Sequence, residues 1–213
     1  MITQGQVGPV NTTASLSAGT QTNTRLGNMG DAIVSELHGR YYETVYRRAG
    51  YFAANPSGVT TTATTSGTTT AIVGINISNP ITSPVNLVIN KVGYAFTVAF
   101  AAAADVAFGV GYNSGTSVTQ TTPLTVRSAY VGVGSAGFGL VSSSVTFPTA
   151  PNFTHVLAAG LTGAVTTTPL VQGLIDLEGS VILPPGAYAG IFTTTAGGAS
   201  GFFGSISWEE VPL

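Results

Sequence analysis

Residues 181–192 read VILPPGAYAGIF, and this stretch carries the clearest structural signal in the chain. An apolar run ends at Leu183, two prolines and Gly186 follow, and a second apolar run starts at Ala187. Proline cannot donate to a strand ladder, and a Pro-Gly pair is typical of a tight turn. We therefore expect two consecutive strands joined by a Pro-Pro-Gly corner, a connection that is common in jelly rolls.

Short apolar runs of the same kind recur through residues 71–213, at the spacing of roughly ten residues that is typical of β-sandwiches. They are separated by Gly, Pro, Asn and Ser, and some alternate, so that Val85, Leu87 and Ile89 share one face. No long stripe with a helical period follows Ala71. The sequence predicts an all-β fold: an antiparallel jelly-roll-like β-sandwich of about eight to ten strands, preceded by an extended N-terminal arm.

The segments before the predicted sandwich differ in composition. Residues 1–30 are small and polar without apolar periodicity, which indicates an extended or flexible arm. Residues 31–52 concentrate charge, and residues 53–70 form a linker rich in threonine and serine. The start of the chain has no basic region followed by an apolar core, so we expect no signal peptide. The sandwich itself is expected over 71–213.

Charge is scarce and unevenly distributed. Charged residues make up 7% of the chain, against about 25% in a typical soluble domain. The chain has 6 basic and 8 acidic residues, and seven of these charged residues lie at or before Arg48. With a net charge of −2, no overall field attracts nucleic acid or a membrane surface. A surface with so few charges is usually covered, and symmetric assemblies provide such cover.

The charged segment, DAIVSELHGRYYETVYRR at 31–48, is compatible with two backbone conformations. The spacing of apolar residues from Ile33 to Val45 favours a helix, whereas Gly39 and the β-prone residues after it favour a strand. We favour a short helical or turn piece up to His38 and an extended strand from Arg40.

Three patterns could carry chemistry, and each has a simpler interpretation. GVGSAG (132–137) has the spacing of a dinucleotide loop but leads into a strand pattern, which indicates a β-turn. Asp176 and Glu178 share a face of one predicted strand and could form a glycosidase pair, but no second cluster accompanies them. His38 and His155 are far apart, and the chain has no cysteine. The sequence predicts no enzymatic activity, no cofactor and no metal site.

Three stretches carry a family resemblance: VSELHGRYYETVYRRAGYF (34–52), LEGSVILPPGAYAG (177–190) and GSISWEEVP (204–212). Together they resemble virion structural proteins of tailed bacteriophages, in particular the small jelly-roll head proteins called decoration, cement or minor capsid proteins. The resemblance covers 35–60 and 171–213. It implies a β-sandwich module that binds the capsid exterior and often trimerises, is made in the host bacterial cytoplasm, and has no catalytic residues.

These observations lead to two sets of candidate contact residues. Tyr and Arg favour interfaces, so docking on the major capsid protein or another virion protein is expected to use Arg25, Glu36, Arg40, Tyr41, Tyr42, Glu43, Tyr46, Arg47 and Arg48. Contacts within a homo-oligomer, expected to be a trimer, would use Lys91, Arg127, Asp176, Glu178, Glu209 and Glu210.

Two alternatives remain open. The charges of the 31–48 segment could merely solvate an otherwise insoluble end of the chain. The protein could also be a receptor-binding or adhesive fibre or spike module that recognises a surface glycan. The single tryptophan, Trp208, lies in a terminal strand rather than a loop, which weighs against the glycan hypothesis.

Overall fold

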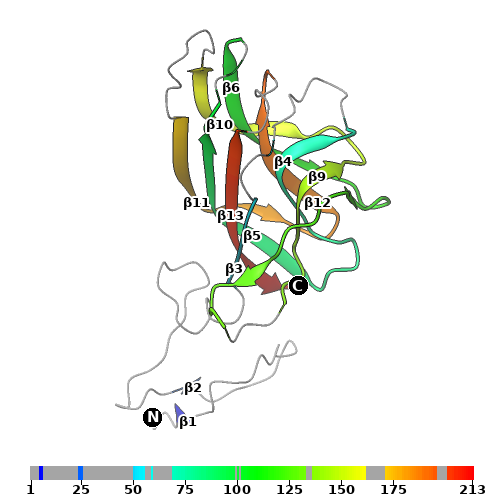
Figure 1. Ribbon diagram of the computed structural model, residues 1–213. Helices are drawn as coiled ribbons and strands as arrows, with labels where there is room; N and C mark the ends of the chain where they lie inside the picture. Colours follow the sequence, from blue (N-terminus) through cyan, green and yellow to red (C-terminus); the bar gives the residue numbers. More distant parts are fainter. Residues whose placement is uncertain are drawn as a thin grey trace.

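The computed structural model describes residues 5–6, 24–25, 50–55, 59, 69–98, 100, 102–132, 136–161, 171–195 and 201–213. Within these ranges all regular secondary structure is β (Figure 1). The strands β1 (Gly5–Gln6) and β2 (Thr24–Arg25) form a short parallel pair. The remaining strands form two antiparallel sheets packed face to face. The predicted all-β sandwich is confirmed.

One sheet has five strands and the other has six. The five-stranded sheet has the order β11 (Val171–Leu183), β5 (Val85–Phe96), β13 (Phe202–Pro212), β3 (Gly50–Ala54) and β8 (Arg127–Ser128). The six-stranded sheet has the order β10 (Asn152–Leu161), β6 (Ala104–Tyr112), β12 (Ala187–Thr193), β4 (Ile72–Ser78), β9 (Leu140–Thr146) and β7 (Thr119–Gln120).

The connections wind the chain between the two sheets as in a jelly roll. The strands β3, β13, β5 and β11 lie in one layer, and β4, β12, β6 and β10 lie in the other. Consecutive members of this set therefore change layer at every connection except the one from β6 to β10. The short strands β7 and β8 and the longer β9 belong to an insertion at that point, and they extend both sheets on one side.

The sandwich begins earlier in the chain than the sequence analysis expects. Strand β3 (Gly50–Ala54) pairs with β13 from Gly50 to Ala54, so it belongs to the five-stranded sheet rather than to the charged segment and the linker. Alternation explains its place, because Tyr51 and Ala53 are buried while Phe52 and Ala54 are exposed. The rest of the charged segment, and most of the arm and linker, lie outside the described residues.

Inward-facing side chains of both sheets form the main core. Val85, Leu87 and Ile89 of β5 are all buried, as their alternation predicts. Trp208 is completely buried and stacks on Tyr51, with 5.9 Å between ring centroids. Full burial of such large side chains provides most of the hydrophobic stabilisation of a sandwich.

A second apolar cluster lies on the other face of the six-stranded sheet. Phe147 stacks on Tyr188 with 4.5 Å between centroids, and Phe192 packs edge-on against Phe147 at 6.1 Å. The Tyr188 ring lies directly over Gly111, where a Cβ atom would overlap it. Phe147, directly after β9, thus packs on two aromatic side chains of β12 and covers part of this face.

The Pro-Pro-Gly corner forms as predicted. The N–H of Ala187 donates to the carbonyl of Pro184 at 2.9 Å, and Gly186 has φ +88°, as the third residue of a type II turn requires. The side-chain amide of the buried Asn79 donates to the carbonyls of Val85 and Leu183 at 2.8 and 2.9 Å. Asn79 therefore ties the start of β5 to the end of β11.

Replacing Gly186 with alanine should destabilise the fold. The left-handed φ is unfavourable for alanine, and the added Cβ would lie 2.6 Å from the carbonyl oxygen of Asn113. We expect the free energy of unfolding to fall by roughly 1–3 kcal/mol, measured by urea denaturation followed by Trp208 fluorescence.

The matched control for this substitution is Gly115→Ala in the neighbouring turn. A Cβ atom there would meet only Asn113 Oδ1, at an ordinary 3.7 Å. The control should change the free energy of unfolding by less than about 0.5 kcal/mol. Equal effects at Gly186 and Gly115 would show that the corner tolerates a side chain.

Candidate functional site

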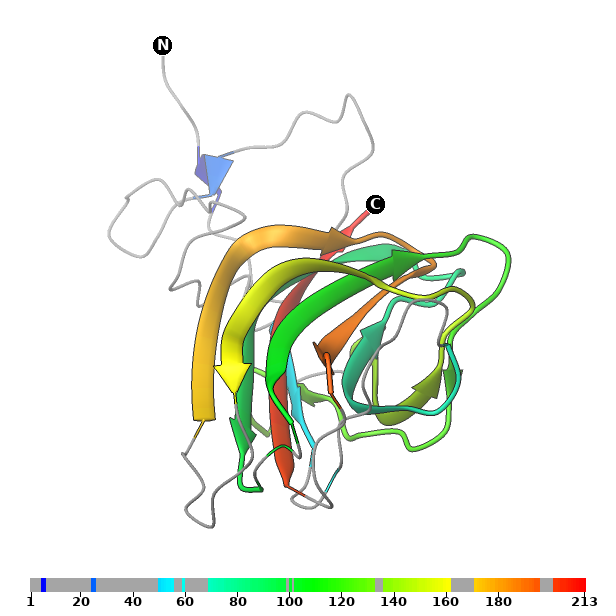
Figure 2. The same cartoon turned by 90° about the horizontal axis from the view of Figure 1, so that it is seen from above.

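Strands β10 and β11 form the edges of the two sheets on the same side of the sandwich. Figure 2 shows them curving alongside each other. They are 10 and 13 residues long, and neither has a second neighbour among the described strands. Val156 on β10 and Leu174 on β11 are 73% and 71% exposed. Long, apolar, unpaired edges are sites where proteins commonly associate.

A cleft of about 500 Å³ opens between these two edges. Strands β6 and β10 form one wall, and the end of β11 with the Pro-Pro-Gly corner forms the other. Its lining consists of Val110, Gly111, Tyr112, Asn152, Thr154, His155, Ser180, Val181, Ile182, Leu183, Pro184 and Ala187. The lining contains no Asp, Glu, Lys or Arg. Tyr112 is 58% exposed, so the cleft has an aromatic side chain that solvent can reach.

The hydrogen bonds of Thr154 determine which ring nitrogen of His155 carries the proton and which can accept a hydrogen bond in the cleft. Thr154 Oγ1 donates to the carbonyl of Phe108 at 3.2 Å and lies 3.0 Å from His155 Nδ1. A hydroxyl has one hydrogen, so the Thr154 oxygen accepts from His155 and the proton is on Nδ1. In neutral His155, Nε2 is then a hydrogen-bond acceptor, and no described residue bonds to it.

Tyr94 joins the two sheets near the same edge. Its hydroxyl donates to the carbonyl of Leu157 on β10 at 3.2 Å, although Tyr94 itself is on β5 in the other sheet. Burial raises the pKa of the Tyr94 phenol above its usual 10.0, because the charged form would lose solvation. Tyr94 therefore holds β10 in place as a neutral donor.

A bulge on β11 carries the candidate acidic residues. Asp176 pairs with Lys91 and Val181 with Ile89, so four residues of β11 lie opposite one residue of β5. Glu178 and Gly179 have φ values of 50° and 72°. The regular alternation that the glycosidase interpretation assumed is therefore wrong at Glu178.

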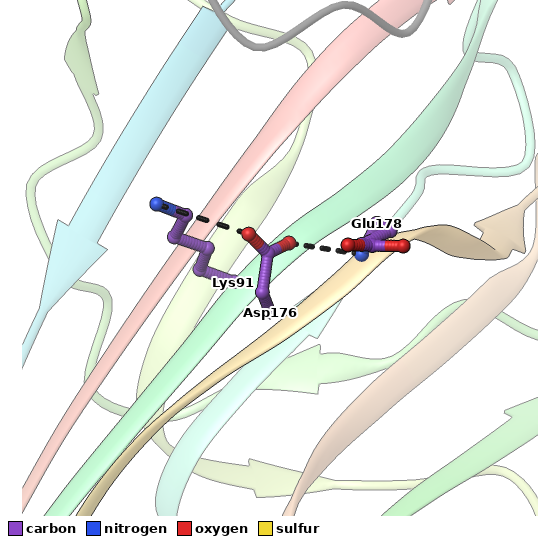
Figure 3. A network of polar contacts seen from close by, with 3 residues as sticks. All are labelled: Lys91, Asp176 and Glu178. Carbon is purple, nitrogen blue, oxygen red and sulfur yellow. Dashed lines mark hydrogen bonds and ion pairs between the residues drawn. The ribbon is translucent and has the colours of Figure 1, made fainter.

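Asp176 braces this bulge, as Figure 3 shows. Its Oδ1 accepts a hydrogen bond from the backbone N–H of Glu178 at 3.0 Å, and its Oδ2 lies 4.0 Å from Lys91 Nζ. The Lys91 and Asp176 side chains are partly exposed, so their ion pair contributes at most about 1 kcal/mol. This pairing occurs within one chain and needs no neighbouring subunit.

The two C-terminal glutamates are buried in their own chain. Glu210 Oε1 accepts from the N–H groups of Phe138 and Gly139 at 2.8 and 2.9 Å, and from Trp208 Nε1 at 3.2 Å. Glu209 is also buried. The sequence analysis expects both to contact a neighbouring subunit. Burial takes them off the surface that a neighbour could reach, and Glu210 instead fixes the loop before β9.

The other candidate residues have different outcomes. Arg127 is exposed on β8, at the far edge of the five-stranded sheet. The backbone of Arg25 in β2 pairs with that of Gln6 in β1. The other docking residues, Glu36, Arg40, Tyr41, Tyr42, Glu43, Tyr46, Arg47 and Arg48, lie outside the described residues, so their role stays a prediction.

The outward face of the five-stranded sheet has a shallow hollow of about 510 Å³. Small residues on three neighbouring strands form its floor, namely Ala54, Gly93, Ala95 and Ser205. The larger Phe203 and Leu174 stand beside it. Lys91 of β5 pairs with Asp176 of β11. Two residues away on each strand, Gly93 pairs with Leu174. We call this surface the outer face.

No protein-family model, curated protein or solved structure matches this chain. Among the described residues, no group of three or more His, Asp or Glu side chains could hold a metal ion. The same residues include no helix long and apolar enough to cross a membrane.

Sequence reasoning missed Tyr112, Asn152 and Asn79. Tyr112 and Asn152 come together only because β6 and β10 are neighbours across a long insertion. The available signal for Tyr112 was its place at the end of an apolar run, directly before the turn residues Asn113 to Gly115. Asn79 could have been noticed as a polar residue before Pro80, where a strand must end.

Replacing Glu210 with alanine should cost on the order of 2–4 kcal/mol of stability, because two backbone N–H groups and the Trp208 indole lose their acceptor. Urea unfolding followed by Trp208 fluorescence measures this. Glu210→Gln keeps an acceptor oxygen and should cost clearly less. If alanine and glutamine behave alike, the carboxylate oxygen does not organise the loop.

Proposed function

We propose that this chain is a non-enzymatic virion structural protein that decorates or cements a phage capsid shell as a homo-oligomer, a trimer. The supporting observation is the outer face, an apolar surface that combines a hollow of small residues with large exposed side chains beside it. The resemblance of the HGRYYE and LPPG segments to phage head proteins supports the virion setting.

The occupant that we propose for the outer face is a second copy of the chain. One subunit supplies both the hollow and the protruding Leu174 and Phe203. In the proposed trimer, the protruding side chains of one copy enter the hollow of the next, in a head-to-tail contact that closes a ring of three. Lys91 and Asp176 lie next to each other, so each subunit also offers one basic and one acidic group to its neighbour. A stable contact needs about 800 Å² from each partner, and a face that includes three strands of 11 to 13 residues is of sufficient extent.

The distribution of charge favours assembly. Seven charged residues follow Arg48, and Glu209 and Glu210 are buried. That leaves Lys91, Asp105, Arg127, Asp176 and Glu178 for the surface of the sandwich. Two of these, Lys91 and Asp176, already pair with each other. Burying much of this surface against other subunits removes apolar area from water at little electrostatic cost.

Leu174→Lys should break the oligomer. The lysine would place a charge at the centre of the contact, where its desolvation has no compensation. Light scattering coupled to size-exclusion chromatography should give the mass of three copies for the natural chain and of one copy for the variant. The control is Val131→Lys, which changes a 78% exposed valine in a turn that does not line the hollow.

Two results would contradict this contact. A natural chain that is monomeric at tens of micromolar, a concentration at which weak contacts already form, would exclude stable self-association. A Leu174→Lys variant with the mass of the natural oligomer would place the contact elsewhere.

The charged segment at 31–48 is proposed to dock the oligomer on the shell. Changing Arg40, Arg47 and Arg48 together to alanine should weaken co-sedimentation with empty capsids by about tenfold or more, because arginines dominate many interfaces. The control is Arg127→Ala, which instead removes a positive charge from the far edge of the five-stranded sheet. Undiminished capsid binding by the triple variant would mean that the segment only solubilises the chain.

A further inference from the structure

We propose that the cleft between β10 and β11 is a binding site for a neutral saccharide. This site is separate from the proposed assembly contact, because Leu174 and the hollow are on the outward face of the five-stranded sheet, whereas the cleft opens between the two layers. Its volume of about 500 Å³ is within the range of roughly 300–1,000 Å³ that is usual for small-ligand pockets.

The charge of the lining argues for a neutral ligand. Of the seven charged residues after Arg48, none lines the cleft. Phosphate, sulfate and carboxylate ligands are normally held by Arg or Lys, and cationic ligands by carboxylates. The polar groups are instead a phenol, an amide, two hydroxyls and an imidazole, from Tyr112, Asn152, Thr154, Ser180 and His155.

The arrangement of these groups suits a polyhydroxylated ring. Tyr112 is an exposed aromatic side chain with a polar tip, and such rings combine apolar contact with hydrogen bonding. Asn152 pairs with Val110, and Val110 is two residues before Tyr112 on β6, so Asn152 and Tyr112 are diagonal neighbours that both line the cleft. An amide offers both donors and an acceptor, which matches a sugar hydroxyl in either role.

His155 adds a directed acceptor. Its Nδ1 donates to Thr154, and this leaves Nε2 of the neutral ring to accept from a ligand hydroxyl. The opposite wall is mostly apolar, formed by Val181, Ile182 and Pro184. One wall of polar groups facing one apolar wall matches a sugar ring, which has hydroxyls at its edge and C–H groups on its faces.

The wall of the cleft is held in place before any ligand arrives. Asn113, the residue after Tyr112, donates its N–H to the carbonyl of Gly186 at 3.1 Å. Its side-chain oxygen accepts from the N–H groups of Gly115 and Thr116 at 2.9 and 2.8 Å. Tyr112 is thus fixed to the Pro-Pro-Gly corner, and a preformed site loses less entropy on binding.

The experiment uses the full-length protein and three neutral probes: lactose, maltotriose and triacetylchitotriose. Saturation-transfer NMR and isothermal titration calorimetry should detect binding of at least one of them. Tyr112→Ala and Asn152→Ala should each weaken that binding by about tenfold or more, whereas Tyr112→Phe keeps the ring and should stay within about threefold. Phe138→Ala is the control, because it removes another exposed aromatic side chain that does not line the cleft.

Further measurements can overturn the proposal. Because Tyr112 is 58% exposed, its replacement should leave the urea midpoint unchanged, so a loss of binding can be read directly. Binding of none of the three probes at millimolar concentration would refute the site, as would binding that survives both alanine substitutions. A synthetic peptide of residues 1–20 could be tested as a competitor. If it displaced the bound sugar, and if Tyr112→Ala and Asn152→Ala weakened its own binding, the cleft would be a peptide site instead. These measurements depend neither on the mass of the oligomer nor on capsid binding. A negative result would therefore refute the saccharide site without affecting the assembly proposal.

Discussion

The hydrogen bonds of Asn79 determine how the two layers meet at one end of the sandwich. Its side-chain amide holds Val85 and Leu183 of the five-stranded sheet, and its backbone N–H donates to Ala187 of the six-stranded sheet at 2.9 Å. The carbonyl of Asn79 accepts from Gly186 at the same distance. One buried residue thus connects the turn before β5 with the turn before β12. A jelly roll changes layer at such turns, so its winding depends on corners of this kind.

The scarcity of charged residues is a second constraint. Hydrogen bonds from neutral side chains, rather than ion pairs, satisfy backbone carbonyl groups in the interior. Asn55, Asn79 and Ser142 bond to backbone carbonyls inside the sandwich. Glu209 and Glu210 are the buried acidic residues in the described part of the chain, and the three donors to Glu210 come from a loop and an indole rather than from a basic side chain. A buried carboxylate without hydrogen-bond donors would be strongly unfavourable. The few remaining charges are therefore on the surface, where they are too sparse to keep neighbouring molecules apart.

Alternation and turn chemistry were enough to predict the all-β class and the Pro-Pro-Gly corner, because both depend on local sequence. The start of the sandwich was placed too late, since Gly50–Ala54 is short and follows a charged segment, and only its pairing with β13 identifies it as a strand. The bulge at Glu178 was also missed, because a non-glycine residue with positive φ has no clear local signal. The cleft forms between strands that are brought together by pairing with partners far away in the sequence, so local sequence patterns do not reveal it.

The corner and the cleft share residues, and this links fold to function. Leu183 is held by Asn79 and lines the cleft, while Ala187 pairs with Tyr112 across β12 and β6. The aromatic side of the cleft and its apolar wall therefore keep a fixed spacing as long as the corner is intact. On the β10 side, the Tyr94 hydroxyl bond to the carbonyl of Leu157 links the two sheets. The saccharide site that we propose thus lies beside the corner, whereas the proposed contact with other copies uses the outer face.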